Sequence, residues 1–175
     1  MHLRLHSQEY WNKKLIEAVK EGNLKKAIEA IDKGADPNAK DTTNPDGPTA
    51  LMVAIYSGSF NMVIFLLKYA NANVNAEDNN KNTALIYAAK VGSEHSVWYL
   101  NENGADINHK NAFGEDAIGI AEKKGFSNIA NYLRTRDLNY LNIDPDFIYQ
   151  AKSAIDDEIK RIEYGKSSSK IKIRI

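Results

Sequence analysis

The apolar positions of the chain recur in short helical patterns, each interrupted by a glycine. Four segments share this arrangement: LIEAVKEGN at 15–23, LMVAIYSGS at 51–59, LIYAAKVGS at 85–93 and IGIAEKKGF at 118–126. In each, an apolar residue is followed three positions later by alanine and four positions after that by glycine. Residues three apart share one helical face, so each segment predicts a short helix that a neighbour approaches closely at the alanine and that ends at the glycine.

A second amphipathic segment follows each glycine, as in NLKKAIEAIDKG at 23–34 and SFNMVIFLLKYAN at 59–71. The repeating unit is therefore helix, tight turn, helix and polar loop. The glycines at 22, 58, 92 and 125 are separated by 36, 34 and 33 residues, which is a nearly constant period. Because one helix pair cannot bury its apolar face alone, the period predicts pairs stacked in a row.

A polar phrase joins consecutive units. It reads DKGADPNAKD at 32–41, NANVNAED at 71–78 and ENGADINHKN at 102–111. Gly34, Asn71 and Gly104 suit left-handed C-caps, and the Asp, Asn and Gly of the phrase predict a hairpin-like turn. Thr49 and Thr83 are predicted to cap the helices that follow, by accepting hydrogen bonds from free amides.

The segments GPTALMVA at 47–54 and NTALIYAA at 82–89, with GADPNAKD and GADINHKN, resemble the ankyrin repeat. That family's pattern is T-P-L-H-x-A followed by glycine and closing on G-A-D-V-N-A. Three kinds of departure occur: Ala50, Ala84 and Ala117 replace its proline, Met52, Ile86 and Gly119 its histidine, and Asp116 its last threonine. The family's Thr-to-His hydrogen bond is thus left without its histidine.

The resemblance implies an all-α ankyrin-like solenoid of about four helix-turn-helix repeats with hairpin-like loops. The predicted organisation is an N-terminal extension at 1–10, repeats at about 11–41, 42–78, 79–111 and 112–137, a C-terminal capping helix at 138–165 and a basic tail at 166–175. The fourth repeat is degenerate, as a terminal repeat is expected to be.

The segment at 144–165 predicts one further helix, with Asp144 as N-cap, Pro145 at the first helical position and Gly165 as the stop. Its apolar stripe consists of Ile148, Ala151, Ile155, Ile159 and Ile162. We expect this helix to seal the open end of the solenoid, and a partner-binding or dimerising helix is the alternative. The alternating Ile and basic residues of 170–175 are interpreted as a frayed terminus, with a pairing strand or a phosphate-binding or lipid-binding tail as the alternative.

Charge and composition exclude several classes. Lys plus Arg and Asp plus Glu each number 23, so no net field favours nucleic acid. There is no cysteine, which removes disulfides and thiolate chemistry, and no apolar run is long enough to span a membrane. The opening MHLRLHSQEYW lacks the apolar centre of a secretory signal, and its first residues, MHLRLHS, are expected to be a loosely held end. A monomeric cytoplasmic protein is expected, with secretion into a host cell as the alternative.

No residue pattern predicts catalysis. The four histidines, His2, His6, His95 and His109, show no metal-binding spacing, and His95 and His109 are interpreted as surface residues. No phosphate-binding glycine loop or serine-nucleophile motif occurs, and the adjacent Asp156 and Asp157 do not face each other on a helix. We therefore predict no catalytic residue, no metal and no cofactor; an enzyme would require perturbed carboxylates or histidines clustered in a deep pocket.

Function is consequently expected to lie in the surface. Ankyrin-like proteins bind other proteins through a concave face made of loop tips and first helices, and the resemblance implies the same here, for a protein partner of unknown identity. From the loops, the implied contact residues are Pro45, Asp46, Pro48, Asn79, Asn80, Asn82, Ala112, Phe113 and Glu115. From the first helices, they are Tyr56, Ser57, Tyr87, Lys90, Val91, Lys123 and Lys124.

Aromatic residues supply much of the energy of buried interfaces, so Tyr56, Tyr87 and Phe113 are the principal candidates. The alternative is that Tyr87 packs between first helices and that Phe113 anchors its own loop. The three lysines either select an acidic partner or form a solvated face. The predicted function is a non-enzymatic scaffold or adaptor, such as a bacterial effector, inhibitor or immunity protein. The alternative is an assembly or membrane-associated module that acts through the C-terminal helix and basic tail.

Overall fold

Short helices form where the repeated pattern predicts them. The computed structural model describes residues 7–171, and the side chains of 7–163. The first helices of the pairs are α1 (Gln8–Lys20), α3 (Ala50–Tyr56), α5 (Ala84–Val91) and α7 (Ala117–Lys123). The second helices are α2 (Leu24–Asp32), α4 (Phe60–Ile64) with its π-helical continuation η1 (Phe65–Tyr69), α6 (Glu94–Glu102) and α8 (Ser127–Thr135). The predicted all-α solenoid is confirmed.

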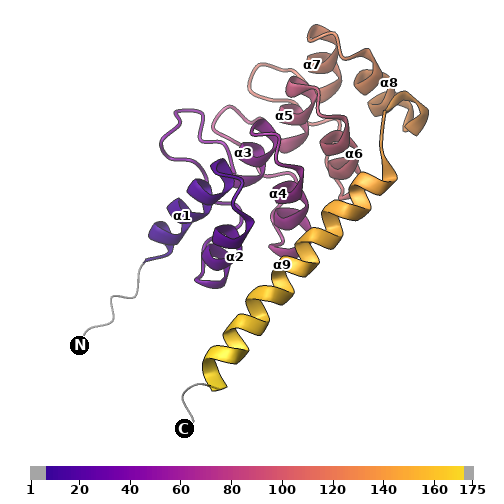
Figure 1. Ribbon diagram of the computed structural model, residues 1–175. Coiled ribbons are helices and arrows are strands. Elements are labelled where there is room, and N and C mark those ends of the chain that lie inside the picture. Colours follow the sequence, from indigo (N-terminus) through magenta and orange to yellow (C-terminus); the bar gives the residue numbers. More distant parts are fainter. Residues whose placement is uncertain (1–6, 172–175) are drawn as a thin grey trace.

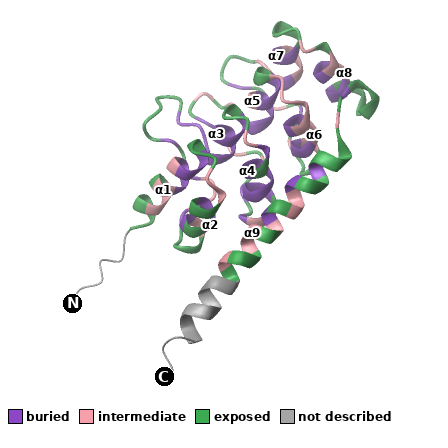
Figure 2. Ribbon diagram, viewed as in Figure 1, coloured by how far each residue is buried: buried purple, intermediate pink, exposed green. Residues whose placement is uncertain are grey.

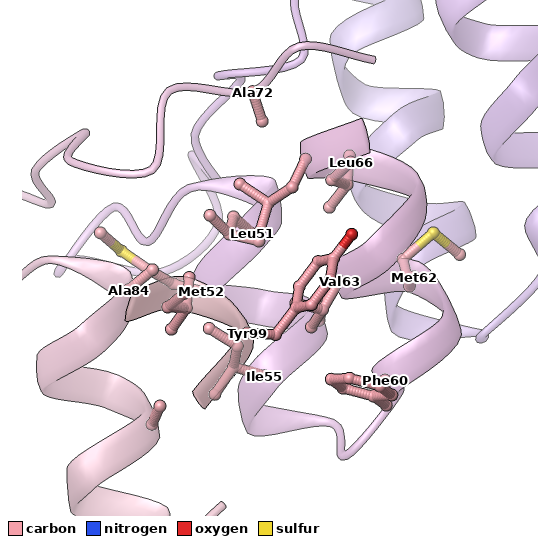
Figure 3. Close-up of a cluster of buried hydrophobic side chains, with 14 of the residues drawn as sticks. Leu51, Met52, Ile55, Phe60, Met62, Val63, Leu66, Ala72, Ala84 and Tyr99 are labelled. Carbon is pink, nitrogen blue, oxygen red and sulfur yellow. The ribbon is translucent and has the colours of Figure 1, made fainter. Parts of the chain in front are cut away.

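The first helices stack in chain order, α1 on α3, α3 on α5 and α5 on α7, and the second helices form a layer beside them (Figure 1). Leu15, Leu51 and Leu85 hold equivalent positions and are at most 2% exposed. Ile118 is only half-buried, because α7 belongs to the last pair and no further pair covers it. Figure 3 shows the core where α3, α4 and their neighbours meet, with Leu51, Met52, Val63 and Tyr99 among its side chains.

The predicted helix ends are present. Gly92 follows α5 in the left-handed conformation with φ of 73°, and a Cβ there would lie 2.5 Å from Cζ of Phe126. Any side chain at this position would therefore displace the ring of Phe126, which immediately precedes α8, the second helix of the next pair. Asn71 takes the same backbone conformation with φ of 57°, which confirms its predicted role as a substitute for glycine.

Of the two predicted N-caps, the one at Thr49 is confirmed and the one at Thr83 is wrong. Thr49 Oγ1 accepts a hydrogen bond from Met52 N at 3.4 Å, and the Met52 sulfur accepts one from Thr49 N at 3.4 Å. Methionine thus closes the contact for which the family uses histidine. Thr83 Oγ1 is buried and has no hydrogen-bond partner among the described residues. The loop before α5 is held instead by Asp78, which accepts hydrogen bonds from N and Nδ2 of Asn82 at 2.8 and 2.9 Å.

Asp116, which replaces the family's threonine, caps α7 by accepting from Gly119 N at 2.8 Å. Replacing Asp116 with Ala is expected to lower the free energy of unfolding by about 0.5 to 2 kcal/mol, because an amide loses its acceptor. Thr83→Val is the matched control: it removes a hydroxyl that makes no hydrogen bond, so we expect an unchanged or higher stability. Urea denaturation measures both, and equal losses would contradict the assignment of the two caps.

The C-terminal helix α9 (Pro145–Ile171) lies elsewhere than expected. It does not seal the end of the stack but runs lengthwise across the second helices, over α6, α4 and α2 (Figure 1). A helix of 27 residues reaches about 40 Å at 1.5 Å per residue, which matches several pairs spaced about 8 to 10 Å apart. Lying lengthwise buries a long apolar stripe that the end of the stack is too small to cover.

The predicted stripe is confirmed as the contact face of α9. Ile148, Ala151 and Ile155 are buried against the core, and Ile159 and Ile162 are half-buried (Figure 2). Two polar features fix the helix in place: Tyr69 at the end of η1 donates a hydrogen bond to Asp156, and Lys152 lies 5.6 Å from the ring centre of Tyr99.

His95 also differs from its prediction as a surface residue. Its ring lies under the start of α9, with its centre 4.9 Å from that of Phe147 and 5.8 Å from that of Phe60. The sequence places these three aromatic rings far apart, and only the lengthwise path of α9 brings them together.

Two predicted boundaries are wrong. The helix α1 begins at Gln8, inside the predicted extension at 1–10, because Ser7 Oγ accepts a hydrogen bond from Tyr10 N at 3.3 Å and caps it. At the other end α9 continues through Gly165 to Ile171, since one glycine costs a helix only about 1 kcal/mol and does not by itself end it. Residues 166–171 of the predicted tail are therefore helical, not a strand; residues 1–6 and 172–175 lie outside the described residues.

Candidate protein-binding groove

Each inter-repeat loop turns around one buried Asp or Asn. These residues are Asp41, Asp78 and Asn111, which are 4 to 7% exposed. Asp41 accepts from N and Oγ1 of Thr43 at 3.0 and 2.6 Å, and Asn111 accepts from N of Phe113 and of Glu115 at 3.0 Å each. Sequence reasoning missed this role. The signal was available, because each residue follows the repeated Asn of the loop phrase by three positions.

The repeated Asn itself ties neighbouring repeats together. Asn38 Oδ1 accepts a hydrogen bond from Asn73 N at 2.7 Å, and Asn75 Oδ1 accepts one from Asp106 N at 2.8 Å. An Asn at this position therefore satisfies a backbone amide of the following repeat. This explains physically why the polar phrase recurs at a nearly fixed interval.

Hydrogen bonds also join the tip of each loop to the tip of the preceding loop. Asn79 N donates to Asp46 O at 2.8 Å, Asn80 Nδ2 donates to Asp46 Oδ1 at 2.9 Å, and Ala112 N donates to Asn80 O at 2.9 Å. Asn79 Nδ2 also donates to Pro45 O at 3.0 Å. Several polar loop residues that were predicted to contact a partner therefore hydrogen-bond to a neighbouring loop and hold the loops in one row.

A continuous groove runs between this row and the first helices. One hollow of about 620 Å³ lies between the first loop and α3, and another of about 220 Å³ lies between the next two loops, α5 and α7. Both are lined by Asp46, Tyr87 and Lys90, so they are parts of one groove. A third hollow of about 480 Å³ continues it along α1 and shares Lys20 with the first. We call these three hollows together the groove.

The structure brings most of the predicted contact residues to this groove. Its lining includes Pro45, Asp46, Pro48, Tyr56, Ser57, Asn80, Asn82, Tyr87, Lys90, Phe113, Glu115, Lys123 and Lys124. Asn79, Val91 and Ala112 do not line it. Pro48 is buried, and its carbonyl accepts from Asp41 N at 2.8 Å, so it belongs to the floor and not to the loop tips. That the lining residues bind a partner stays a prediction.

The prediction also missed the part of the groove that the first repeat contributes. Lys20 lies two residues before Gly22, as Tyr56, Lys90 and Lys123 lie two residues before their own glycines. These four residues are therefore equivalent in the repeats, and all four line the groove. The fixed offset from the glycine was sufficient to find Lys20.

The three predicted aromatic residues differ in their surroundings. Tyr56 and Phe113 are 73% and 72% exposed, so Phe113 does not anchor its loop. Tyr87 is half-buried, and its hydroxyl donates to Asp78 Oδ2 at 3.0 Å. Burial, followed by this hydrogen bond, raises the pKa of Tyr87 above its ordinary value, so the hydroxyl keeps its proton. Tyr87 is a wall of the groove that also fixes a loop, while Tyr56 and Phe113 are available for contact.

Two carboxylates of the groove are neutralised within the chain. Lys20 Nζ lies 2.6 Å from Asp41 Oδ2. Burial alone would raise the pKa of Asp41, but the hydrogen bonds from Lys20 and Thr43 outweigh it and hold the pKa below its ordinary value. Lys123 pairs with Glu115, and the hydrogen bond from Lys123 lowers the pKa of that carboxyl.

Within residues 7–171, no group of three or more His, Asp or Glu side chains is arranged to hold a metal ion. None of the helices in this range is both long enough and apolar enough to cross a bilayer.

Comparison with known proteins gives a family match: the model described as ankyrin repeats (3 copies) matches residues 15–111. Cyclin-dependent kinase 4 inhibitor B of Homo sapiens is 30% identical over 122 residues, which cover 69% of this chain and 85% of that protein. Cyclin-dependent kinase inhibitor 2A of Monodelphis domestica is 29% identical over 136 residues, which cover 77% of each.

Alpha-latrotoxin-Lg1a of Latrodectus geometricus is 27% identical over 124 residues, which cover 66% of this chain but only 9% of the toxin. The chain therefore spans most of the two kinase inhibitors and a small part of the toxin. The family match covers the first three repeats of the groove, while Phe113, Glu115 and the α7 residues that also line it lie beyond the matched range.

Proposed function

Because the chain belongs to the ankyrin-repeat family, we propose that it is a non-enzymatic scaffold or adaptor that captures a protein partner in the groove. One observation carries the proposal: two large aromatic side chains, Tyr56 and Phe113, are 73% and 72% exposed in a groove whose loops are hydrogen-bonded into one row. A rigid surface of this kind loses little conformational entropy on binding, so more of the contact energy appears as affinity.

An inhibitory role is the finer form of this proposal. Two relatives that align over most of their own length are named as inhibitors of cyclin-dependent kinases. A partner captured in the groove would have its contacting surface covered, and this would inhibit any activity that depends on that surface. An effector or immunity protein, acting in the cytoplasm as a monomer, would work by the same capture.

The alternative function, assembly or membrane association through the C-terminal helix, has less support. The apolar stripe of α9 that would serve it is already buried against the chain's own second helices. Deletion of residues 166–175 distinguishes the two functions. Unchanged capture of the partner supports the groove, whereas loss of oligomerisation or of lipid binding would support the helix and tail.

The double substitution Tyr56→Ala with Phe113→Ala tests the groove directly. If the two rings are interface anchors, partner capture from the native source should weaken by about 30-fold or more, since one anchor is worth about 2 kcal/mol or more. Tyr149→Ala is a matched control, because Tyr149 is 74% exposed and lies on α9, away from the groove. Equal effects of the two changes, or full capture by the double variant with an unchanged melting temperature, would reject the proposal.

A further inference from the structure

We propose that the part of the groove between α5 and α7 takes an acidic segment of the partner, with one apolar side chain entering the hollow and carboxylates on either side of it. The inference rests on the proposed function and specifies the chemistry of the partner. It is carried by the walls of this hollow, by the charges at its rim and by the contrast with the neighbouring hollow over α3.

The walls of the hollow suit an apolar side chain. Ile86, Tyr87, Phe113 and Ile120 line it, and its volume is about 220 Å³. A single apolar side chain projecting from a partner fits a hollow of this volume, with the exposed ring of Phe113 in its lining.

The rim of the hollow carries an excess of positive charge, although the chain as a whole is neutral. It is formed by three lysines, Lys90, Lys123 and Lys124, against two carboxylates, Asp46 and Glu115. Glu115 is paired with Lys123, and its pKa is also lowered by the charge of Lys90. Among the described residues, the Asp46 carboxylate accepts a hydrogen bond only from the neutral amide of Asn80, so the rim has a formal excess of one positive charge. Lys90 and Lys124 make no ion pair within the described residues. Both remain available to an anionic group, and a basic segment would meet like charge.

The preference is local to this end of the groove. The neighbouring hollow over α3 is lined by two lysines and two carboxylates, and one pair of these, Lys20 and Asp41, is already joined. That hollow therefore offers Tyr56 and neutral surface but no excess of charge. The difference gives the partner a direction, with its acidic segment over α5 and α7 and its neutral part over α3.

The spacing of the lysines specifies the pattern of the segment. Lys90 is the last residue but one of α5 and Lys124 follows α7, and neighbouring helices are packed about 8 to 10 Å apart. Successive side chains of an extended segment point to opposite faces, so residues i, i+2 and i+4 face the groove together, at a rise of about 3.3 Å per residue. Carboxylates at i and i+4 therefore lie about 13 Å apart on one face, which suits two long lysine side chains on neighbouring helices, with an apolar residue at i+2 over the hollow.

Three blocked peptides test the inference in the full chain. Each has a central Leu with one flanking residue two positions before it and one two positions after it; the flanking residues are Glu in the first peptide, Gln in the second and Lys in the third. Titration with each peptide to about 5 mM, followed by amide shifts in the NMR spectrum, detects dissociation constants in the millimolar range. We expect the Glu peptide to shift the amides of 86–91 and 111–124, to bind at least tenfold more tightly than the Lys peptide and to weaken as salt rises.

The double reversal Lys90→Glu with Lys124→Glu should abolish these shifts or weaken binding at least tenfold. Its matched control is Lys33→Glu with Lys160→Glu, which changes the net charge equally at exposed residues outside the groove lining. Absence of shifts with the Glu peptide, equal binding of the Lys peptide, or equal effects of the two reversals would overturn the inference.

The partner captured from the native source separates this inference from the function on which it rests. If Tyr56→Ala with Phe113→Ala loses the partner while Lys90→Glu with Lys124→Glu retains it, the groove binds a protein but the acidic segment is wrong. If neither double variant loses the partner, the proposed function itself fails.

Discussion

Leu85→Ala is expected to lower the free energy of unfolding by about 2 to 5 kcal/mol. Leu85 is 0% exposed on α5, which packs between α3 and α7 in the middle of the stack. Removing its branched end leaves a cavity that helices held on both sides cannot readily fill. Urea denaturation followed by circular dichroism measures the loss, and an unchanged slope with a lower midpoint would locate the effect in the stability of the fold.

The equivalent residue of the last repeat provides the control. Ile118 has the same place in its helix as Leu85, but it is only half-buried because no pair follows α7. Ile118→Ala should therefore cost clearly less than Leu85→Ala. A negligible loss at Leu85, or a larger one at Ile118, would mean that the pairs do not cover one another in the order described.

The repeat pattern was predictable because it is local in the sequence. The position of Leu85 follows from the alanine three residues later and the glycine seven residues later, and both spacings lie within one helix. The same holds for Asn71, whose left-handed conformation follows from its place in the loop phrase. The length of each short helix, its buried face and its C-terminal end all depend on residues a few positions apart in the sequence.

The parts that sequence reasoning missed depend on contacts between distant segments. Thr49 and Thr83 are the same residue at the same place in their repeats, yet only the Thr49 hydroxyl accepts a hydrogen bond from the amide three residues later. The second bond of the Thr49 cap uses the Met52 sulfur, for which Ile86 has no equivalent. The stripe of α9 was predicted correctly, but an apolar stripe does not specify which surface covers it. The choice of the second helices depends on Phe60, Tyr69 and His95, which no local pattern connects to α9.

The candidate site shows the same division. The exposed rings of Tyr56 and Phe113 were expected from their places at a helix end and a loop tip. The side chains of Asn79 and Asn80 were expected at the surface too, but they hydrogen-bond to the preceding loop. An Asn in a turn is polar in either case, and its partner becomes apparent only when the loops lie side by side.

Removing α9, by ending the chain after Ile143, is expected to destabilise the solenoid by about 3 kcal/mol or more. Ile148 and Ile155 are at most 5% exposed, and burying an aliphatic side chain of this size contributes about 1.5 to 3 kcal/mol. The truncation also uncovers Phe60 and Tyr99 on the second helices. We therefore expect a lower urea midpoint and binding of an apolar dye to the exposed face.

Two further variants show whether the buried stripe is the cause. Ending the chain after Glu163 keeps every buried residue of the stripe and should retain most of the stability. Ile155→Ala keeps the full length of α9 but leaves a cavity where the 0% exposed isoleucine side chain was packed. It should therefore lower the free energy of unfolding by about 2 to 5 kcal/mol. Because α9 contacts both α2 and α4, amide exchange should accelerate in both helices after the long truncation. Exchange rates and a midpoint equal to those of the full chain would show that the solenoid is stable without α9.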